Sequence, residues 1–480
     1  MRRTKIVATI GPASSSPDMI AHLLDAGMDV ARLNFSHGTH EDHIRHIATL
    51  REAARALDRP MAILQDLQGP KIRTGSLVDG GPVQLRAGER FNITTREIVG
   101  TAARVSTTYT ALPHDVRPGD RILLSDGLIE LRVLGSTNEE VQTEVVFGGE
   151  LREHQGINLP GVNVSAPALT PKDAADLEFG LAQDVDYVAL SFVRRAADIR
   201  DIKQRIAAAG KATPVIAKIE KPEALDELTA ILEVADAIMV ARGDLGVEMP
   251  PERVPVVQKQ LIEAANAAGV PVITATQMLD SMIRNPRPTR AEASDVANAI
   301  IDGTDAVMLS GETAAGLFPI ESVKMMARIA EAAEASGRHG DLHTAVAPAN
   351  VRASSVADAI SAAACAIVQT LPVRAIVAFT MSGSTARLVA HLRPTATILA
   401  FTPNETVYHR LNLVWGVTPI MCDYVARLDE LGDRVGEILL ARGFAQPDDM
   451  VVMTGEHPIA ARGQTNFVKV MQLHSEEQKD

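Results

Sequence analysis

Eight short apolar segments, each ending in glycine or polar residues, constrain the fold more than any other feature of this 480-residue chain. They span residues 5–11, 29–36, 61–69, 186–193, 215–220, 237–246, 270–278 and 305–314. Such runs are typical of strands buried on both faces of a parallel sheet. Helix-like stretches lie between most of them, and one begins with the capping box of Thr289 and Glu292. Eight alternating units favour an α/β fold with a closed (β/α)8 TIM barrel over an open sheet.

The connection after the third predicted strand is too long for a barrel loop. Between Gln68 and Asp173, about a hundred residues alternate apolar and polar side chains, with glycine at the turns, which is typical of antiparallel strands. We interpret them as a small β-barrel domain that acts as a lid. After residue 338 the pattern predicts a further α/β domain. The predicted domains are a barrel of residues 1–69 and 167–338, a lid of residues 70–166, and a C-terminal regulatory domain of residues 339–480.

Composition limits the partners of this chain. The net charge is −13, which disfavours binding to nucleic acid or to an anionic membrane. No run of about 18 apolar residues is present, so we expect no membrane span. The two cysteines, Cys365 and Cys422, lie outside any CxxC pair, which argues against a cysteine zinc site. We therefore expect a cytoplasmic protein.

Polar residues stand at the predicted carboxyl ends of six strands, where a βα barrel has its active site. In chain order they are Arg32, Asn34, Ser36 and His37, then Asp66, Lys71 and Arg73, then Lys218 and Glu220, Arg242 to Asp244, Thr276 and Gln277, and finally Ser310 and Glu312. Buried charges are costly unless they are paired or bind a metal. Ion pairing at the barrel mouth could explain one such residue, but six strand ends together favour a functional site.

The chemistry of this set predicts metal-dependent phosphoryl transfer. Glu220 and Asp244 are oxygen ligands of the kind that Mg²⁺ or Mn²⁺ prefers. Arg32 and Lys218 supply positive charge for a phosphoryl group. The backbone N–H groups of Gly243 and Asp244, with the Thr276 hydroxyl, suit a carboxylate. His40, His43 and His46 are also spaced like metal ligands, but we interpret them as a solvated helix face. Neither a phosphate-binding P-loop motif nor the protein-kinase motifs are present.

At these residues the sequence resembles the pyruvate kinase family. The matching motifs are, in order, KIVATIGPAS, RLNFSHG, QGPKIRTG, AKIE, MVARGDLGVE, ATQMLDSMIRNPRPTRAE and DGTDAVMLSGETA. The resemblance covers essentially the whole chain, and residues 239–314 are its most specific part. It implies transfer of the phosphoryl group of phosphoenolpyruvate to ADP, giving pyruvate and ATP in glycolysis. Two competing interpretations are a carbon–carbon lyase of the related barrels, which would not need ADP, and a catalytically silent effector-binding scaffold.

The resemblance also implies roles for individual residues. Arg32 and Lys218 are expected to hold the phosphoryl group, Glu220 and Asp244 the divalent ion, and Gly243, Asp244 and Thr276 the substrate carboxylate. The nucleotide phosphates are expected to meet Asn34, Phe35, Ser36, His37 and Arg73. The implied catalytic residues are Lys218, Arg32, Thr276, Ser310 and Glu312, the last three of them on the path of the proton.

Two departures from the family pattern concern ions and nucleotide. Many members need K⁺ and read DTKGPEIRTG where this chain reads DLQGPKIRTG. Leu67 therefore lacks a hydroxyl ligand, and Lys71 places an ammonium where a glutamate stands. Our hypothesis is that K⁺ is not required because Lys71 replaces it. In the alternative, Lys71 is a surface residue and K⁺ still binds Asn34, Ser36 and Asp66. In addition, Gln155 stands where a nucleotide-binding lysine is common.

Regulation is expected in the C-terminal domain. The segment TMSGSTARL, residues 380–388, follows a predicted strand and opens a helix, so its N–H groups can bind an anion. In the family, the matching loop binds the phosphate of a sugar-phosphate activator. The candidate effector residues are Ser382, Gly383, Ser384 and Thr385. Simple helix N-capping is the alternative explanation. The family is commonly a homotetramer, and we carry this expectation over.

Overall fold

The computed structural model describes residues 2–337, 355–423, 427–457 and 464–473. Eight parallel strands close a barrel in the order β1-β16-β15-β14-β13-β12-β3-β2. Their bounds are β1 Lys5–Ile10, β2 Val30–Asn34, β3 Ala62–Asp66, β12 Tyr187–Leu190, β13 Val215–Ile219, β14 Ala237–Ala241, β15 Val272–Ala275 and β16 Ala306–Leu309. The predicted (β/α)8 barrel is therefore confirmed. Every strand is among the eight segments that the sequence analysis identified.

Helices surround the barrel. They are α1 Pro17–Ala26, α2 His40–Ala56, α4 Pro171–Ala182, α5 Ala196–Ala208, α6 Glu223–Asp226, α7 Leu228–Leu232, α8 Arg242–Glu248, α9 Val254–Ala268, α10 Arg290–Ile301, α11 Gly311–Ala314 and α12 Pro319–Ala335. Local sequence sets where several begin. Thr289 and Glu292 form the expected capping box of α10, and Thr39 with Asp42 does the same for α2.

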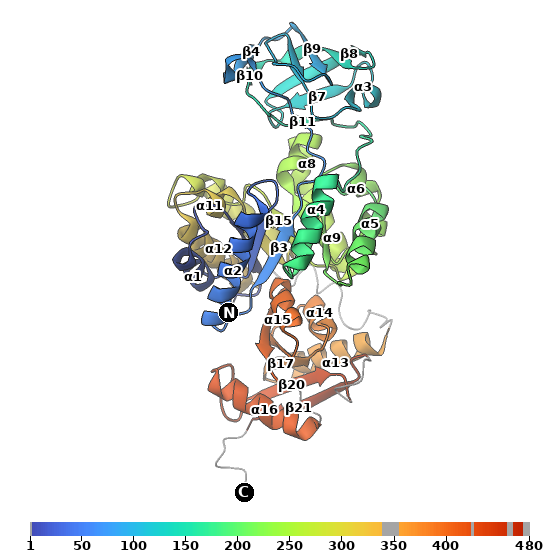
Figure 1. The fold of residues 1–480 in the computed structure, drawn as a ribbon. Coiled ribbons are helices and arrows are strands. Elements are labelled where there is room, and N and C mark those ends of the chain that lie inside the picture. The colour runs from blue at the N-terminus through green and yellow to red at the C-terminus, as the bar shows by residue number, and fades with distance from the viewer. Residues whose placement is uncertain (1, 338–354, 424–426, 458–463, 474–480) are drawn as a thin grey trace.

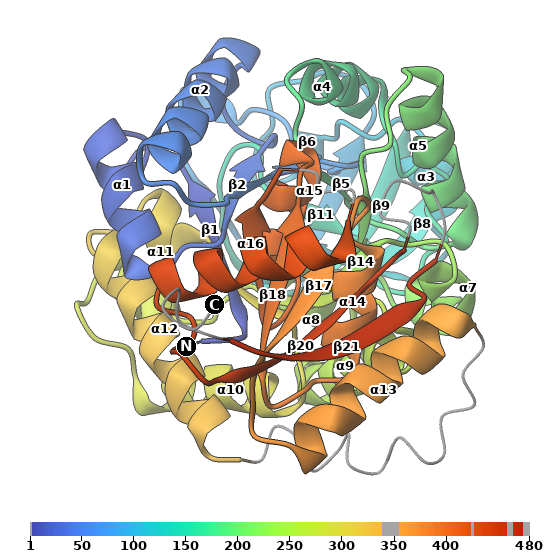
Figure 2. The same cartoon turned by 90° about the horizontal axis from the view of Figure 1, so that it is seen from below.

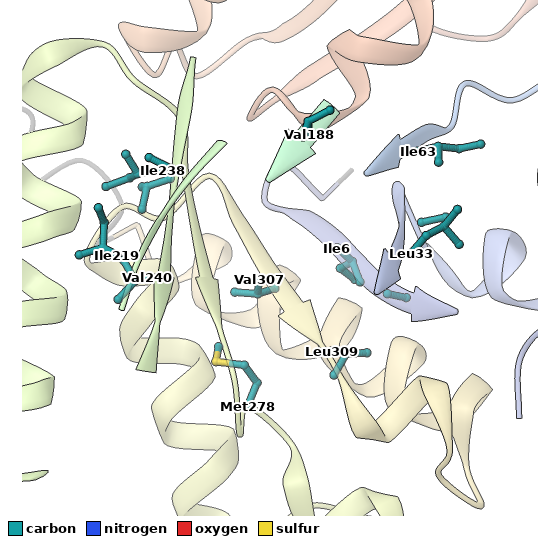
Figure 3. Close-up of a cluster of buried hydrophobic side chains, with 14 of the residues drawn as sticks. Ile6, Leu33, Ile63, Val188, Ile219, Ile238, Val240, Met278, Val307 and Leu309 are labelled. Atoms are coloured by element: carbon teal, nitrogen blue, oxygen red, sulfur yellow. The ribbon is translucent and has the colours of Figure 1, made fainter. Parts of the chain in front are cut away.

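The barrel strands are buried on both faces, as their composition requires. Residues such as Ile6, Leu33 and Val307 point outward and pack against the helices (Figure 3). Their neighbours Val7 and Val30 belong to a second cluster that fills the barrel interior. Alternation along each strand therefore divides the apolar residues between the two clusters.

The segment between β3 and α4 folds as two sheets and carries the short helix α3, Leu112–Asp115. A six-stranded sheet has the order β11-β7-β8-β9-β5-β6, and a two-stranded sheet pairs β10 with β4. The strands are β4 Val83–Leu85, β5 Arg90–Thr94, β6 Arg104–Ser106, β7 Arg121–Leu124, β8 Ile129–Ser136, β9 Glu140–Phe147, β10 Gly149–Leu151 and β11 Ile157–Asn158. This unit stands over one end of the barrel, above α8 (Figure 1).

The C-terminal part is a five-stranded sheet of order β19-β18-β17-β20-β21, in which only β21 runs antiparallel to its neighbour. Its strands are β17 Val373–Phe379, β18 Thr397–Thr402, β19 Val417–Met421, β20 Met450–Gly455 and β21 Phe467–Gln472. Its helices are α13 Val356–Thr370, α14 Ser384–His391, α15 Glu405–Arg410 and α16 Leu428–Ala441. The predicted domain boundary at residues 338 and 339 lies outside the described residues. No helix of the described residues is both long and apolar enough to cross a membrane.

The C-terminal part lies against the amino-terminal end of the barrel strands (Figures 1 and 2). Leu413 belongs to the same apolar cluster as the barrel interior. Around it the contact is polar: Arg393 pairs with buried Asp305 at 2.9 Å, and the Arg393 guanidinium lies 4.5 Å from the centre of the Trp415 ring. The inserted unit and the C-terminal part thus occupy opposite ends of the barrel (Figure 1).

The buried Arg393–Asp305 pair predicts a large stability effect. Arg393→Met leaves the Asp305 carboxylate buried without its cation, so we expect the free energy of unfolding to fall by about 3–5 kcal/mol. Arg442→Met is the matched control, because Arg442 and Asp58 form an exposed pair across the same two domains at 3.0 Å. We expect a loss below about 1 kcal/mol there. Urea denaturation followed by circular dichroism measures both. Equal losses in the two variants would contradict the assignment.

Candidate active site

A cluster of buried charges lies at the carboxyl ends of the barrel strands. Lys218 Nζ lies 2.8 Å from Glu220 Oε1 and 3.1 Å from Asp66 Oδ1. Arg32 Nη2 lies 2.6 Å from Asp66 Oδ2. The side chains of Asp66 and Glu220 are each 1% exposed. Four of the predicted residues, taken from three strands, therefore meet in one place, and Asp66 joins the two cations.

Two residues that the sequence analysis missed orient this cluster. Lys218 Nζ donates to Ser191 Oγ at 2.7 Å, and Ser191 in turn donates to the carbonyl of Leu67. Arg32 Nη1 donates to Thr9 Oγ1 at 2.9 Å. Thr9 lies in β1 and Ser191 follows β12, the two strands for which no site residue had been proposed. A hydroxyl residue at or just after the end of each of these strands was the available signal.

The charges of the cluster set its pKa values. Burial of Lys218 lowers its pKa, but the nearby carboxylates of Asp66 and Glu220 outweigh burial and raise the pKa overall. Burial likewise opposes ionisation of Asp66, but Lys218 and Arg32 hold its pKa below the usual value. Glu220 differs, because burial, assisted by the charge of Asp244, raises its pKa to about 7. The ammonium of Lys218 is thus stabilised, whereas the charge on Glu220 lacks full compensation.

The residues around Glu220 fit a divalent cation. Asp244 lies in the first turn of α8, close enough for its charge to raise the pKa of Glu220. Glu220 Oε2 also accepts a hydrogen bond from the Phe192 backbone N–H at 2.7 Å, which fixes the carboxylate. Within the described parts of the chain, no three His, Cys, Asp or Glu side chains gather as a metal cluster. A hard ion held by Glu220 and Asp244 would therefore complete its sphere with substrate and water oxygens, as Mg²⁺ commonly does.

The predicted carboxylate seat is built from strained backbone. Thr276 has φ of 74° and Gln277 has φ of 52°, which is rare for residues with a side chain and costs about 1–3 kcal/mol each. A Cβ at Gly243 would lie only 2.6 Å from Thr276 Cγ2, so this position has no room for any other residue. Thr276 and the Gly243–Asp244 turn, which come from neighbouring strands, therefore lie directly against each other.

Arg242 stabilises this strained turn. Its Nη2 donates to the Thr276 carbonyl at 2.7 Å, and its Nε lies 3.2 Å from the Ala275 carbonyl. On the other side, Nη1 pairs with Asp295 at 2.6 Å. In the sequence, Arg242 stands at a predicted strand end and had no predicted role. The structure shows that its guanidinium holds the backbone that presents Thr276.

A cavity of about 260 Å³ lies between the barrel and the inserted domain. Its lining includes Arg73 of the predicted nucleotide residues and Asp244 of the predicted metal ligands, together with Lys71 and Gln155, the two departures from the family pattern. His37 lies close by, since its pKa is lowered by burial and then by the charges of Lys71, Arg73 and Arg32. This concentration of positive charge beside the β2–α2 loop suits polyphosphate.

The surroundings of Lys71 and Glu312 were not defined by the sequence pattern. Lys71 is exposed, and the ion pairs described for Asp66 are with Arg32 and Lys218 instead. Glu312 Oε1 accepts from the Leu279 N–H at 3.0 Å and Oε2 from the Ser310 N–H at 2.7 Å. Both oxygens of Glu312 are therefore engaged in holding backbone. The proton path through Ser310 and Glu312 stays a prediction.

The predicted effector residues lie far from this site, in the C-terminal domain. Ser382, Ser384 and Thr385 line a second cavity of about 60 Å³, together with Thr465, Asp423 and Glu456. The N-cap position of α14 is Gly383, which makes no side-chain capping bond. The Thr380 hydroxyl accepts from the Gly383 N–H at 2.8 Å and the Ser382 hydroxyl from the Ser384 N–H at 3.4 Å, so capping by local hydroxyls stays the alternative explanation. Binding of an effector there stays a prediction.

The interpretation of three helix histidines as a solvated face is wrong for His43. This residue is only 5% exposed and stacks on Phe35. His40 pairs with Asp176 at 2.8 Å, on the neighbouring helix α4. A three-residue spacing placed these side chains on one helix face, but nothing in the sequence showed that α4 and the β2–α2 loop would cover that face.

Comparisons with known proteins agree across both large domains. The sequence model described as "Pyruvate kinase, barrel domain" matches residues 1–323, and "Pyruvate kinase, alpha/beta domain" matches residues 358–471. A pyruvate kinase of Geobacillus stearothermophilus is 49% identical over 472 residues, which is 98% of this chain and 80% of that protein. One from Staphylococcus aureus is 48% identical over the same share. The crystal structure of a pyruvate kinase from Cryptosporidium parvum is 36% identical, has a TM-score of 0.93, and covers 98% of this chain and 96% of its own.

The contacts of Arg242 predict a loss of activity without loss of the fold. Arg242→Met removes the donors that hold the Thr276 turn, so turnover should fall about 10- to 100-fold, since small misplacements at an active site have effects of this size. Arg242→Lys should rescue little, because one ammonium cannot replace the fork of donors. Arg287→Met, an exposed arginine in the following loop, is the control. Steady-state kinetics measure the effect, and unchanged turnover in Arg242→Met would refute it.

Proposed function

The chain belongs to the pyruvate kinase family and is a phosphotransferase, and we propose that the charge cluster beneath its lid passes a phosphoryl group from phosphoenolpyruvate to ADP. One observation supports placing the reaction at this charge cluster. Lys218 lies against Glu220 and Asp66, with the charge of Asp244 within reach of both Lys218 and Glu220. Two acidic ligands and fixed positive charge therefore surround one position.

In the proposed reaction, Arg32 and Lys218 bind the phosphoryl group of the substrate. Asp66 pairs with both cations and keeps them charged. The two cations then stabilise the negative charge that spreads over the phosphoryl oxygens. The N–H groups of Gly243 and Asp244, with Thr276, hold the carboxylate end. Glu220 and Asp244 would hold a divalent ion, which would supply further positive charge to the substrate oxygens.

An oxygen of ADP attacks phosphorus in line, and the bond from phosphorus to the enol oxygen breaks. The β2–α2 loop and Arg73 are proposed to hold the nucleotide phosphates. The lid then excludes water, which would otherwise compete as acceptor. A direct link supports this arrangement: Asn158 of the lid donates to Glu248 of α8 at 3.0 Å, and the same carboxylate pairs with Lys221 at 2.6 Å. Gln155 lines the cavity between the barrel and the inserted domain. We expect it to contact the ADP phosphates more weakly than a lysine would.

The enolate that remains takes a proton at carbon to give pyruvate. Thr276, Ser310 and Glu312 are the proposed path of this proton. Of the three, Thr276 is the residue in direct contact with the carboxylate seat. The raised pKa of Lys218 keeps its ammonium beside the enolate oxygen, which favours the stabilising role over proton donation.

K⁺-independence is the second part of the proposal. Leu67 is buried and offers no oxygen from its side chain. Lys71 adds its charge to Arg73 near His37, where the nucleotide phosphates are proposed to lie. Asp66 is already paired with Arg32 and Lys218, so we do not place the Lys71 ammonium on Asp66. We propose that it acts on the nucleotide phosphates beside His37 of the β2–α2 loop. It supplies the positive charge that K⁺ would otherwise bring to the phosphates. The competing possibility, a K⁺ on Asn34, Ser36 and Asp66, is an outcome of the test below.

The same proposal extends to assembly and regulation. We propose a cytoplasmic homotetramer, which family membership supports. The cavity at Ser382 to Thr385 supports a sugar-phosphate effector, because hydroxyl and N–H groups at a helix N-terminus suit a phosphate.

The assignment of the reaction is tested by supplying substrates separately. With Mg²⁺, pyruvate should form from phosphoenolpyruvate only when ADP is added, whereas a carbon–carbon lyase would not need ADP. Lys218→Met and Glu220→Gln should each lower turnover by at least about 10³-fold, since each removes charge from the reacting centre. Glu233→Gln, an exposed carboxylate after α7, is the control and should match the parent. Retained activity in Lys218→Met would move the site elsewhere.

The K⁺ proposal predicts a reversal by one substitution. In buffer with tetramethylammonium as the only monovalent cation, the parent should be fully active, and added KCl should change turnover by less than about twofold. Lys71→Glu should lower K⁺-free turnover on the order of 10²-fold and make it respond to K⁺. Lys324→Glu, an exposed lysine on α12, controls for the change in net charge. A strong K⁺ requirement in the parent enzyme would defeat the proposal.

A further inference from the structure

The loop between β2 and α2, residues 35–39, contacts a buried histidine on α2. His43 lies on the second turn of α2 and is 5% exposed. Its ring stacks face to face on Phe35, with centroids 3.9 Å apart and planes inclined by 8°. Its Nε2 lies 3.1 Å from the carbonyl oxygen of His37. One side chain therefore contacts the loop at two points, on either side of Ser36.

The chemistry of these contacts determines the state of the His43 ring. A carbonyl oxygen only accepts hydrogen bonds, so Nε2 must carry the proton. Nδ1 is buried and has no hydrogen-bond partner, so it stays unprotonated. Burial also lowers the pKa of His43. The imidazole ring is therefore neutral and in a single tautomer. A flip of the ring would break the hydrogen bond from Nε2 to the His37 carbonyl.

Other protein groups hold the rest of the loop backbone. The Phe35 carbonyl accepts from Lys172 Nζ at 2.8 Å, and the Phe35 N–H donates to the Asp66 carbonyl at 2.9 Å. Within the loop, the Ser36 N–H donates to Asn34 Oδ1 at 3.1 Å. The backbone is thus committed to protein partners. The side chain of His37 lies near Lys71 and Arg73, and burial together with their positive charges lowers its pKa.

We propose that His43 is a positioning residue for the nucleotide half of the reaction. It fixes Phe35 and the His37 carbonyl so that Ser36 and His37 face the phosphates of ADP, although His43 itself touches no substrate. This inference rests on the proposed nucleotide role of the loop. A histidine that only filled the core would affect stability and both substrates alike, whereas a positioning residue affects ADP selectively.

Two substitutions separate the two contacts of the ring. His43→Phe keeps an aromatic ring against Phe35 but leaves the His37 carbonyl without its donor. His43→Gln keeps an N–H donor but loses the stacking. We expect His43→Phe to raise the KM for ADP about tenfold while the KM for phosphoenolpyruvate stays within about twofold, as loss of one hydrogen bond to a buried partner predicts. His43→Gln should recover part of the ADP affinity.

Controls make the result decisive. His46→Phe changes a histidine one turn further along α2 whose ring touches His43 only edge-on, at 6.2 Å between centroids, and it should leave both KM values unchanged. Arg73→Met tests the nucleotide site itself. If Arg73→Met raises the KM for ADP and His43→Phe does not, the positioning role is refuted while the site stands. If neither variant changes it, the nucleotide assignment has failed. An equal rise for both substrates, with a matching loss of thermal stability, would also overturn the inference.

Discussion

A buried carboxylate between two cations is the interaction on which the rest of the site depends. Arg32 and Lys218 come from β2 and β13, far apart in the sequence, and two positive charges placed side by side in the barrel mouth would repel each other and lose their hydration. Asp66 at the end of β3 compensates both, at 2.6 and 3.1 Å. The hydroxyl oxygens of Ser191 and Thr9 accept one further hydrogen bond from each cation. This arrangement leaves Glu220 as the carboxylate that lacks full compensation, and so the site is preorganised for an additional cation and an anionic substrate.

Around this charge cluster, several side chains hold the site loops through hydrogen bonds to backbone groups. Arg242 holds the strained turn of Thr276, Glu312 holds the N–H groups of Leu279 and Ser310, and His43 with Lys172 holds the loop of Phe35 and His37. Such turns would relax if left alone, because left-handed backbone and unpaired carbonyls both carry a free-energy cost. The barrel can supply these braces because its interior is closed by apolar residues below, including Leu413 of the C-terminal domain. The inserted domain stands over this rim and contacts it through Asn158 and Glu248.

Much of this was predictable from local pattern. Apolar runs marked all eight barrel strands, since a strand covered on both faces needs no polar alternation. The capping box of Thr289 and Glu292 marked the start of α10 because its hydrogen bonds are local. Strand ends marked Arg32, Lys218 and Glu220, because parallel strands bring their carboxyl ends to one rim. What failed was judgement of exposure: His43 was assigned to a solvated face but is covered by the loop whose residue Phe35 it stacks on. Lys71 is exposed, and its role in place of K⁺ stays a prediction.

The sequence by itself thus determined the number of barrel strands, because this number follows from periodicity. The order of short motifs determined which types of side chain gather at the barrel rim and the family to which the chain belongs. Only the tertiary structure decided which charges pair, which hydroxyls orient them and which buried rings and guanidinium groups brace the loops. Pairing depends on distances of a few ångströms between residues more than a hundred positions apart, such as Asp66 and Lys218, and burial depends on what another element places above a side chain. Neither quantity is encoded in the local spacing of residues along the chain.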